Sequence, residues 1–133
     1  MRLQTFARGL ASLCIATIAV GFCAEAAPAG TRLEASVVDD ATGEPSAARI
    51  AITDAQGKFV EIEGKHEHVQ YLDKRWCYID GSFALAIPAD GASIEIRRGF
   101  ETLPLTATVA SRKSEGTIQK VFRLRRWIDM RSK

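Results

Sequence analysis

The chain contains two histidines, and both lie in the short segment His66-Glu67-His68. In an extended backbone, side chains two residues apart project to the same side, so His66 and His68 could share a metal ion. A zinc site needs a further protein ligand, for which Glu63 and Asp73 are the nearby candidates. Because nothing in the sequence fixes that ligand, we expect a solvated polar loop without a metal or cofactor. A metal site, and with it a small metal-dependent enzyme, is the alternative.

Three aromatic residues, Tyr71, Trp76 and Tyr78, follow the histidines closely. Exposed aromatic rings on a β-sandwich are a common platform for stacking sugar rings. Large aromatic residues are more often buried, so we expect these three mainly to pack against the rest of the domain. A carbohydrate-binding module that uses residues 61–78 is the alternative.

Acidic residues gather in the predicted turns, at Asp39, Asp40, Glu44 and Asp54. Their oxygens suit calcium, but acidic residues in turns usually hydrogen-bond the local backbone. The sequence shows no pair of carboxylates spaced for glycoside hydrolysis, no serine-nucleophile motif and no glycine-rich phosphate loop. We therefore predict a protein that is not an enzyme.

The N-terminus has the pattern of a secretory signal. Arg2 and Arg8 form a short basic region, residues 10–24 are almost wholly apolar, and Ala24-Glu25-Ala26 offers a cleavage site. The apolar run is too short to span a bilayer comfortably. We predict a signal peptide at 1–26, a domain at 27–133, and a periplasmic or secreted protein without a membrane anchor after cleavage. A retained membrane anchor is the alternative.

The charge balance argues against two classes of partner. The chain has 18 Lys and Arg residues against 16 Asp and Glu residues. Loss of Arg2, Arg8 and Glu25 with the signal leaves 16 and 15, a net charge near +1. A domain so nearly neutral is not expected to bind nucleic acid or an anionic membrane surface.

One cysteine, Cys77, remains after the predicted cleavage, because Cys14 and Cys23 leave with the signal. No intrachain disulfide can then form. Cys77 lies between Trp76 and Tyr78, and we expect it to be a small buried apolar residue, with intermolecular pairing as the alternative.

Alternation of apolar and polar residues predicts strands at 32–37, 48–53, 105–110 and 117–124, and a further strand from Phe59. Lys120 occupies an inward position of the last strand, which indicates the edge of a sheet. Residues 61–74 show neither strand nor helix periodicity and are predicted to form the longest loop. Loops of this kind often carry function.

The clearest pattern is a predicted β-hairpin whose strands, 83–87 and 94–97, are joined by a turn at Asp90-Gly91. Its alternation places Leu85 and Ile94 in the core and Glu95 in water. With turns every eight to twelve residues, the sequence predicts an all-β fold, a single antiparallel β-sandwich of about seven strands, immunoglobulin-like or transthyretin-like.

Three segments carry a family resemblance: residues 32–53 with the following turn to Gly57 (V.D..TGEP..ARI.I.D..G), residues 80–104 (DGSF.L.IP..G..IE.RRG.E..P) and Arg126-Trp127-Ile128-Asp129-Met130. Together they resemble the carboxypeptidase-regulatory-like, or transthyretin-like, domain found ahead of the catalytic domain in secreted bacterial metal-dependent hydrolases of the polymerase-and-histidinol-phosphatase kind. There the last segment leads into a His-x-His metal motif, which this sequence lacks. The resemblance implies an accessory β-sandwich without its catalytic domain.

The C-terminal segment is the predicted place of contact with a separate protein or domain. Large apolar residues, among them Trp127 and Met130, stand there beside Arg125 and Arg126. Trp and Arg are the residues most enriched at interface hot spots. We therefore expect an exported, non-catalytic binding or interaction module, accessory to a hydrolase, in which this segment either folds back on the sandwich or meets a partner.

Overall fold

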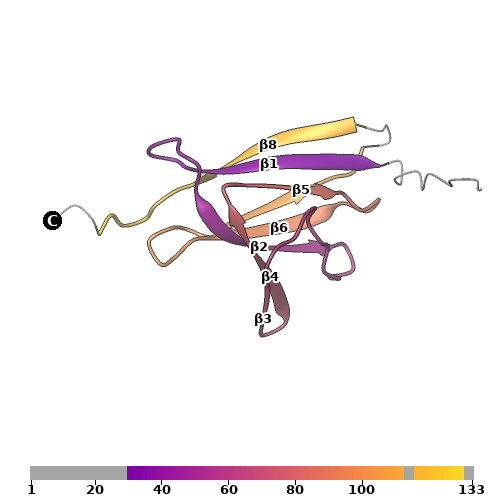
Figure 1. The fold of residues 1–133 in the computed structure, drawn as a ribbon, viewed down its shortest axis with the longest axis horizontal. Coiled ribbons are helices and arrows are strands. Elements are labelled where there is room, and N and C mark those ends of the chain that lie inside the picture. The colour runs from indigo at the N-terminus through magenta and orange to yellow at the C-terminus, as the bar shows by residue number, and fades with distance from the viewer. Residues whose placement is uncertain (1–29, 113–115, 131–133) are drawn as a thin grey trace, which may run out of the picture.

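The computed structural model describes residues 30–112 and 116–130, which form a two-layer β-sandwich (Figure 1). Within these two ranges there are eight strands: β1 (Thr31–Asp39), β2 (Ala47–Asp54), β3 (His68–Tyr71), β4 (Lys74–Asp80), β5 (Ser82–Ala86), β6 (Ala92–Arg97), β7 (Leu105–Val109) and β8 (Gly116–Leu124). The all-β sandwich predicted from the sequence is confirmed. No helix that could cross a membrane occurs among the described residues, and the predicted signal peptide lies outside them.

The strands form a three-stranded sheet in the order β5-β1-β8 and a five-stranded sheet in the order β3-β4-β2-β6-β7. Neighbouring strands are antiparallel except β1 and β8, which run parallel from the pair Thr31–Gly116 to the pair Asp39–Leu124. β8 is an edge strand, as Lys120 indicated, and the Lys120 ammonium lies 5.4 Å from the centre of the Phe122 ring.

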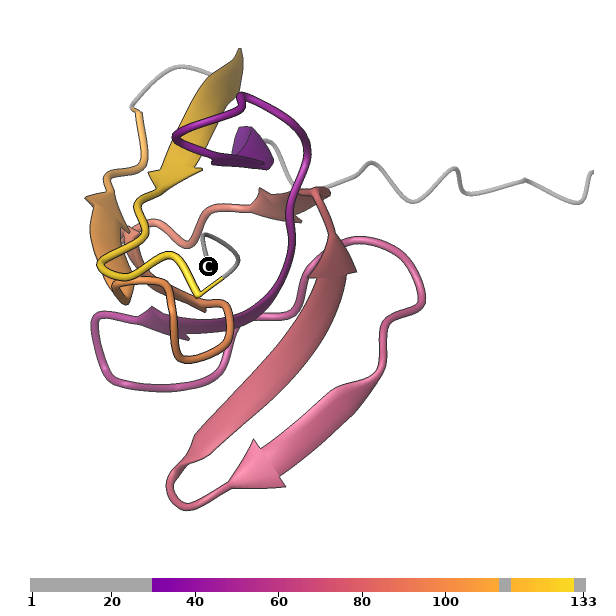
Figure 2. The ribbon, with the colours of Figure 1, turned by 90° about the vertical axis from the view of Figure 1, so that its left-hand side faces the viewer.

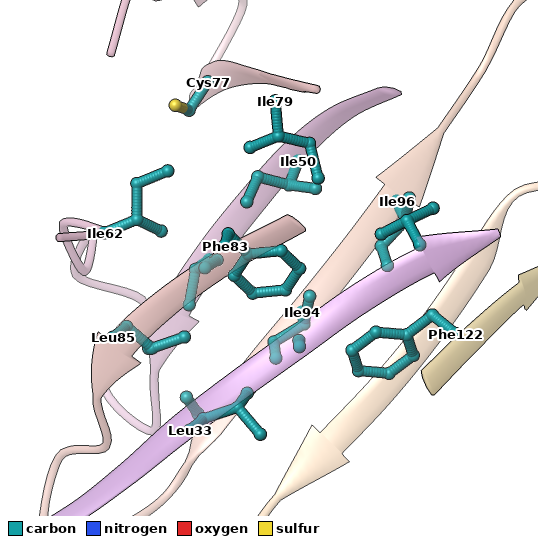
Figure 3. Close-up of a cluster of buried hydrophobic side chains, with 14 of the residues drawn as sticks. Leu33, Ile50, Ile62, Cys77, Ile79, Phe83, Leu85, Ile94, Ile96 and Phe122 are labelled. Atoms are coloured by element: carbon teal, nitrogen blue, oxygen red, sulfur yellow. The ribbon is translucent and has the colours of Figure 1, made fainter. Parts of the chain in front are cut away.

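The core lies between the two sheets and is built by alternate residues of the strands (Figure 3). Every second residue of β1 is buried, and the predicted inward residues Leu85 and Ile94 are fully inaccessible. The rings of Phe83 and Phe122 stack across the three-stranded sheet with their centres 6.2 Å apart. Cys77 is also buried, as expected, and this burial raises the pKa of its thiol. The thiol therefore stays protonated and packs as an apolar group.

The predicted hairpin is wrong, although both of its strands exist. β5 pairs with β1 in one sheet, whereas β6 pairs with β2 and β7 in the other, so the connection at residues 87–91 crosses between the sheets. Gly91 has φ of 88°, and a Cβ there would lie 2.9 Å from the carbonyl oxygen of Val109. The glycine therefore permits a tight crossing instead of a hairpin turn. Alternation fixes which side of a strand is buried, but it does not choose the neighbouring strand.

The predicted loop at 61–74 is only partly a loop. Its second half forms β3, which pairs with β4 in a hairpin that projects from the sandwich (Figure 2). β3 has no apolar alternation because three of its four residues are exposed. The predicted strand at Phe59 is reduced to an isolated bridge with Thr53. The first half of the loop covers the edge of β5, where Glu63 N–H donates to the Ala84 carbonyl at 2.7 Å and Ile62 enters the core.

Candidate functional site

The outer face of the five-stranded sheet carries a row of large side chains. Arg49 of β2 is paired with Tyr78 of β4 on one side and with Arg97 of β6 on the other. Residues directly opposite on neighbouring strands project from the same face, so these three side chains lie side by side across the centre of the sheet. β2, β4 and β6 each have a strand on both sides, which makes this a rigid platform.

Trp76 also belongs to this outer face, yet only 4% of its surface is exposed. The guanidinium carbons of Arg49 and Arg97 lie 5.0 and 5.4 Å from the ring centre and cover the indole. Such cation–π contacts hold a guanidinium at a fixed place while leaving its N–H groups available. Trp76 is therefore buried, as we expected, but as the floor beneath two arginines and not in the core between the sheets.

Glu95 of β6 holds one of the two arginines, Arg97, and shares its carboxylate with Lys74. It accepts from Arg97 Nε at 2.6 Å and is ion-paired with Lys74, and its side chain is 14% exposed instead of standing in water as predicted. Burial opposes ionisation of Glu95, but the hydrogen bonds from Lys74 and Arg97 outweigh it and lower the pKa of the carboxyl. Arg49 has no carboxylate partner within the described part of the chain. Among the described arginines of this row, it is therefore the one without an ion pair.

A hollow of about 460 Å³ opens above this row. Phe100, in the β6–β7 loop, and Tyr78 are its exposed aromatic walls, with 94% and 51% of their surfaces accessible. The hollow continues into two others, of about 270 and 390 Å³, which share Gly99 and Phe100 with it. Trp127 lines the former, and Met130 lines the latter. We call this surface the aromatic–arginine strip; it comprises Tyr78, Arg49, Arg97, Phe100 and Trp127.

The C-terminal segment folds back along the β6–β7 loop. Leu103 N–H donates to the Arg125 carbonyl at 3.0 Å, and Trp127 N–H donates to the Glu101 carbonyl at 3.0 Å. The indole Nε1–H of Trp127 donates to the Phe100 carbonyl at 2.6 Å. These bonds fix the Trp127 ring at the end of the strip while 63% of its surface stays exposed. Ile128 and Met130 are exposed as well, so the backbone folds back but the apolar side chains remain accessible.

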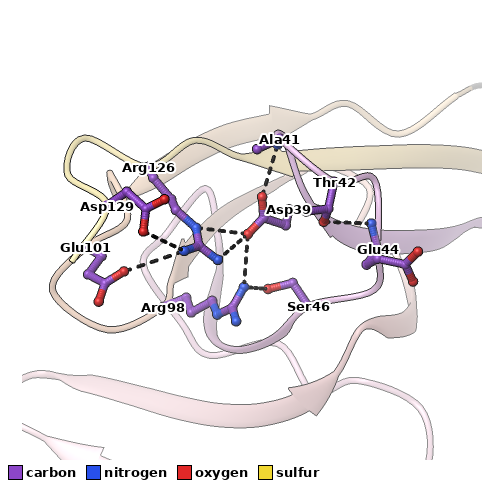
Figure 4. Close-up of polar contacts among 9 residues, drawn as sticks. All are labelled: Asp39, Ala41, Thr42, Glu44, Ser46, Arg98, Glu101, Arg126 and Asp129. Atoms are coloured by element: carbon purple, nitrogen blue, oxygen red, sulfur yellow. Dashed lines mark hydrogen bonds and ion pairs between the residues drawn. The ribbon is translucent and has the colours of Figure 1, made fainter. Parts of the chain in front are cut away.

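Asp39 anchors this segment to the end of β1 (Figure 4). Its carboxylate is buried and accepts from Arg126 Nη2 at 2.7 Å and from Arg126 Nε at 3.1 Å. The Arg126 guanidinium, and then the backbone N–H of Ala41, hold the pKa of Asp39 below its ordinary value. Arg98 reaches the same carboxylate at 3.6 Å and donates to Ser46 Oγ at 2.7 Å. Arg126, predicted as an interaction residue, is thus occupied within the domain, whereas Arg125 lies exposed beside it.

The predicted metal residues point to different surroundings. His66 Nε2 is 2.8 Å from the Glu63 carbonyl oxygen, whereas the His68 ring packs edge-on against Phe59. Glu63, a candidate third ligand, is bound through both oxygens to Arg32, which lowers the pKa of its carboxyl. No group of three or more His, Cys, Asp or Glu side chains suited to a metal occurs in residues 30–112 and 116–130.

Two of the four acidic turn residues, Asp39 and Asp54, accept hydrogen bonds from the backbone. Oδ1 of Asp54 accepts from the N–H groups of Gln56 and Lys58 at 3.0 and 2.8 Å, which is the local turn geometry that we expected. Asp39 is occupied by its arginines. Of the three predicted ligand-loop aromatics, Trp76 is covered, whereas Tyr71 on the projecting hairpin and Tyr78 in the strip are exposed. The expectation that all three pack against the domain is therefore wrong for the two tyrosines.

Sequence reasoning missed Arg49, Arg97 and Phe100. A signal was present, since Arg49 and Arg97 stand at outward positions of predicted strands. What the sequence lacked was the strand order that sets both arginines beside Trp76.

Comparison with known proteins adds little to this geometry. No family model matches the chain, and no curated protein matches it in sequence. A solved structure of a pilus-presented adhesin, Spy0125 (Cpa), is similar over 77% of this chain and 28% of that chain, with 12% identity and a TM-score of 0.39. This chain thus covers under a third of the adhesin structure. At that TM-score the likeness supports no argument about function.

Proposed function

We propose that this chain is an exported, non-catalytic binding module and that its ligand or partner docks on the aromatic–arginine strip. The observation that carries the proposal is the group of three adjoining hollows that meet at Phe100 and are lined by exposed aromatic rings, the first of them also by residues of the central strands β2, β4 and β6. Binding sites combine such aromatic surfaces with a few well-placed polar groups. Exposed aromatic residues that are held in place cost little entropy when they bind.

The lining of the strip supports binding over catalysis. Its polar side chains are chiefly arginines, a tyrosine hydroxyl and a threonine, and Glu101 is the one acidic residue among the described residues that line the three hollows. A guanidinium stays protonated at all ordinary pH values, so it binds anions well but is a poor proton acceptor.

Export and the accessory role rest on the sequence. The signal pattern at 1–26 supports a periplasmic or secreted location, and the resemblance to carboxypeptidase-regulatory-like domains supports a role beside a hydrolase. The exposed Trp127 belongs to the strip and the exposed Met130 adjoins it, so a neighbouring protein or domain would contact the same end of the molecule.

The test is to map binding by NMR on the exported protein. Amide shifts of residues 47–49, 97–103 and 127 would be followed during addition of three probes: a neutral oligosaccharide, an acidic oligosaccharide and a hexaglutamate peptide. We expect at least one probe to shift these amides, and expect Tyr78→Ala or Phe100→Ala to move the titration to higher probe concentrations.

Two matched controls locate the effect. Tyr71→Ala removes an equally exposed tyrosine from the β3–β4 hairpin, and Val121→Ala removes an exposed apolar side chain from the other sheet. Both should leave the shifts intact. If no probe shifts the strip, or if the shifts fall on the three-stranded sheet, the proposed function is wrong.

A further inference from the structure

The charge of the strip narrows the class of ligand. The linings of the first two hollows, which share Arg49 and Arg97, contain no Asp or Glu. Arg97 is bound to Glu95, which it shares with Lys74, and Arg98 is held by Asp39 and Ser46. Arg49 alone has no carboxylate partner among the described arginines of these linings, and Trp76 beneath it fixes its position. A guanidinium placed in this way favours a carboxylate or a similar anion.

The position of the strip on the sheet restricts the class of ligand further. It lies on the face of the sheet, where the backbone groups of β2, β4 and β6 are already used in the ladders on both sides. A peptide that binds by strand addition needs a free edge, which this surface does not offer. The exposed groups are instead the faces of Tyr78, Phe100 and Trp127, which suit the C–H faces of sugar rings.

The shape indicates a chain rather than a single small molecule. The first hollow, of about 460 Å³, is the size of a small-ligand site, and two further hollows continue from it past Phe100. Aromatic rings therefore recur along the strip, and a linear polymer of rings would meet one after another.

We propose that the strip binds an acidic polysaccharide, with a ring carboxylate held by Arg49 and neighbouring sugar rings stacked on Tyr78 and Phe100. This inference rests on the proposed function, because it names the ligand of the same surface. A uronate unit combines the two features that the strip selects, a flat apolar ring face and an anion attached to that ring.

The test compares two probes with the same sugar rings, one charged and one neutral: a tetrasaccharide of galacturonic acid and its methyl ester. Affinities for the exported protein would be measured by calorimetry. We expect the free acid to bind at least tenfold more tightly than the ester, since a hydrogen bond to a charged group contributes about that factor or more. Equal affinities would overturn the inference.

Variants of Arg49 test whether this residue binds the carboxylate of the ligand. Arg49→Gln should weaken binding of the free acid about tenfold or more and leave the ester unchanged, whereas Arg49→Lys should retain part of the preference. Arg123→Gln is the matched control, because it removes the same charge from an exposed position on β8 in the other sheet. If Arg123→Gln weakens binding as much as Arg49→Gln, the attraction is general and the inference fails.

Packing is checked separately, so that a disturbed fold is not mistaken for a lost ligand contact. In a Trp127→Phe background, emission from Trp76 should stay blue-shifted when Arg49 is replaced by lysine. Tyr78→Ala, which does not touch the charge, should weaken both probes by roughly three- to tenfold.

The peptide probe separates this inference from the proposed function. If hexaglutamate binds the strip more tightly than the uronate and depends on Arg49, the glycan assignment fails while the binding module stands. If no probe shifts the strip amides, both fail.

Discussion

The two outer faces of the sandwich each display an arginine from a central strand, but they use it in opposite ways. On the three-stranded sheet, Arg32 lines a polar groove of about 650 Å³ and is ion-paired with Glu34 and Glu63. On the five-stranded sheet, Arg49 stacks on Trp76 without an acidic partner among the described residues. An arginine held by carboxylates has its charge and donors occupied, whereas one held by an aromatic ring remains available.

The largest effect should come from the core that both faces share. Leu85→Ala and Ile94→Ala should each lower the free energy of unfolding by about 2 to 5 kcal/mol, because both side chains are fully buried. Val121→Ala, on the outer face of the three-stranded sheet, should change it by less than about 0.5 kcal/mol. Urea denaturation measures all three, and similar losses for all three would contradict the assigned core.

Removing the floor of the strip should affect one face alone. Trp76→Ala should lower the free energy of unfolding by about 2 to 3 kcal/mol, because a nearly buried indole is lost. It should also release Arg49 and Arg97, so that binding to the strip is lost while the polar groove keeps its structure. NMR shifts of Arg32 and Glu63 would serve as the control, and a change there would mean that the two faces are coupled.

The link between Asp39 and Arg126 should make the end of the strip sensitive to acid. The pKa of Asp39 is lowered in the folded state, so the unfolded chain takes up its proton first as the pH falls. The stabilisation is complete above the unfolded pKa, near 4, and is lost as the pH falls through the folded value. In a Trp76→Phe variant, Trp127 emission should shift further to the red over this range.

Asp39→Asn provides the control for that titration. It should give the red-shifted emission already at neutral pH and remove its acid dependence, because the asparagine cannot ion-pair with Arg126. An acid transition that persists unchanged in Asp39→Asn would show that another group anchors the C-terminal segment.

The smallest effect should come from the paired arginine. Glu63→Gln should leave the melting temperature almost unchanged, since exposed ion pairs contribute little. It should also leave binding at the aromatic–arginine strip unaltered. If Glu63→Gln instead creates uronate binding in the polar groove equal to that of the strip, aromatic rings are not what selects the ligand, and the contrast between the two faces disappears.

The sequence was a good guide to what each strand buries. Alternation assigned Leu85 and Ile94 to the core, and the polar character of Lys120 indicated an edge strand. These properties are local, because the pleat of a strand fixes the side on which each residue stands. These local properties were sufficient to predict an all-β sandwich.

Features that depend on distant pairing were not predicted. The hairpin failed because β5 and β6, adjacent in sequence, belong to different sheets. Phe100 and Trp127 lie close together through bonds between segments far apart in the chain. The strip joins several elements in this way, so most of it was missed, although Tyr78 and Trp127 were singled out as candidates.

The parallel pairing of β1 with β8 has a consequence for how the protein reaches its native state. The first and last strands are partners, so the three-stranded sheet closes only after almost the whole described chain is present. Until then β1 has an open edge and Phe83 lacks the ring of Phe122. Bringing β1 and β8 together lowers the conformational entropy of the long chain between them before the contacts of the sheet have formed. Folding is therefore expected to be slow. A polypeptide that folds slowly stays unfolded for longer, and an unfolded chain can pass through a narrow pore before it folds.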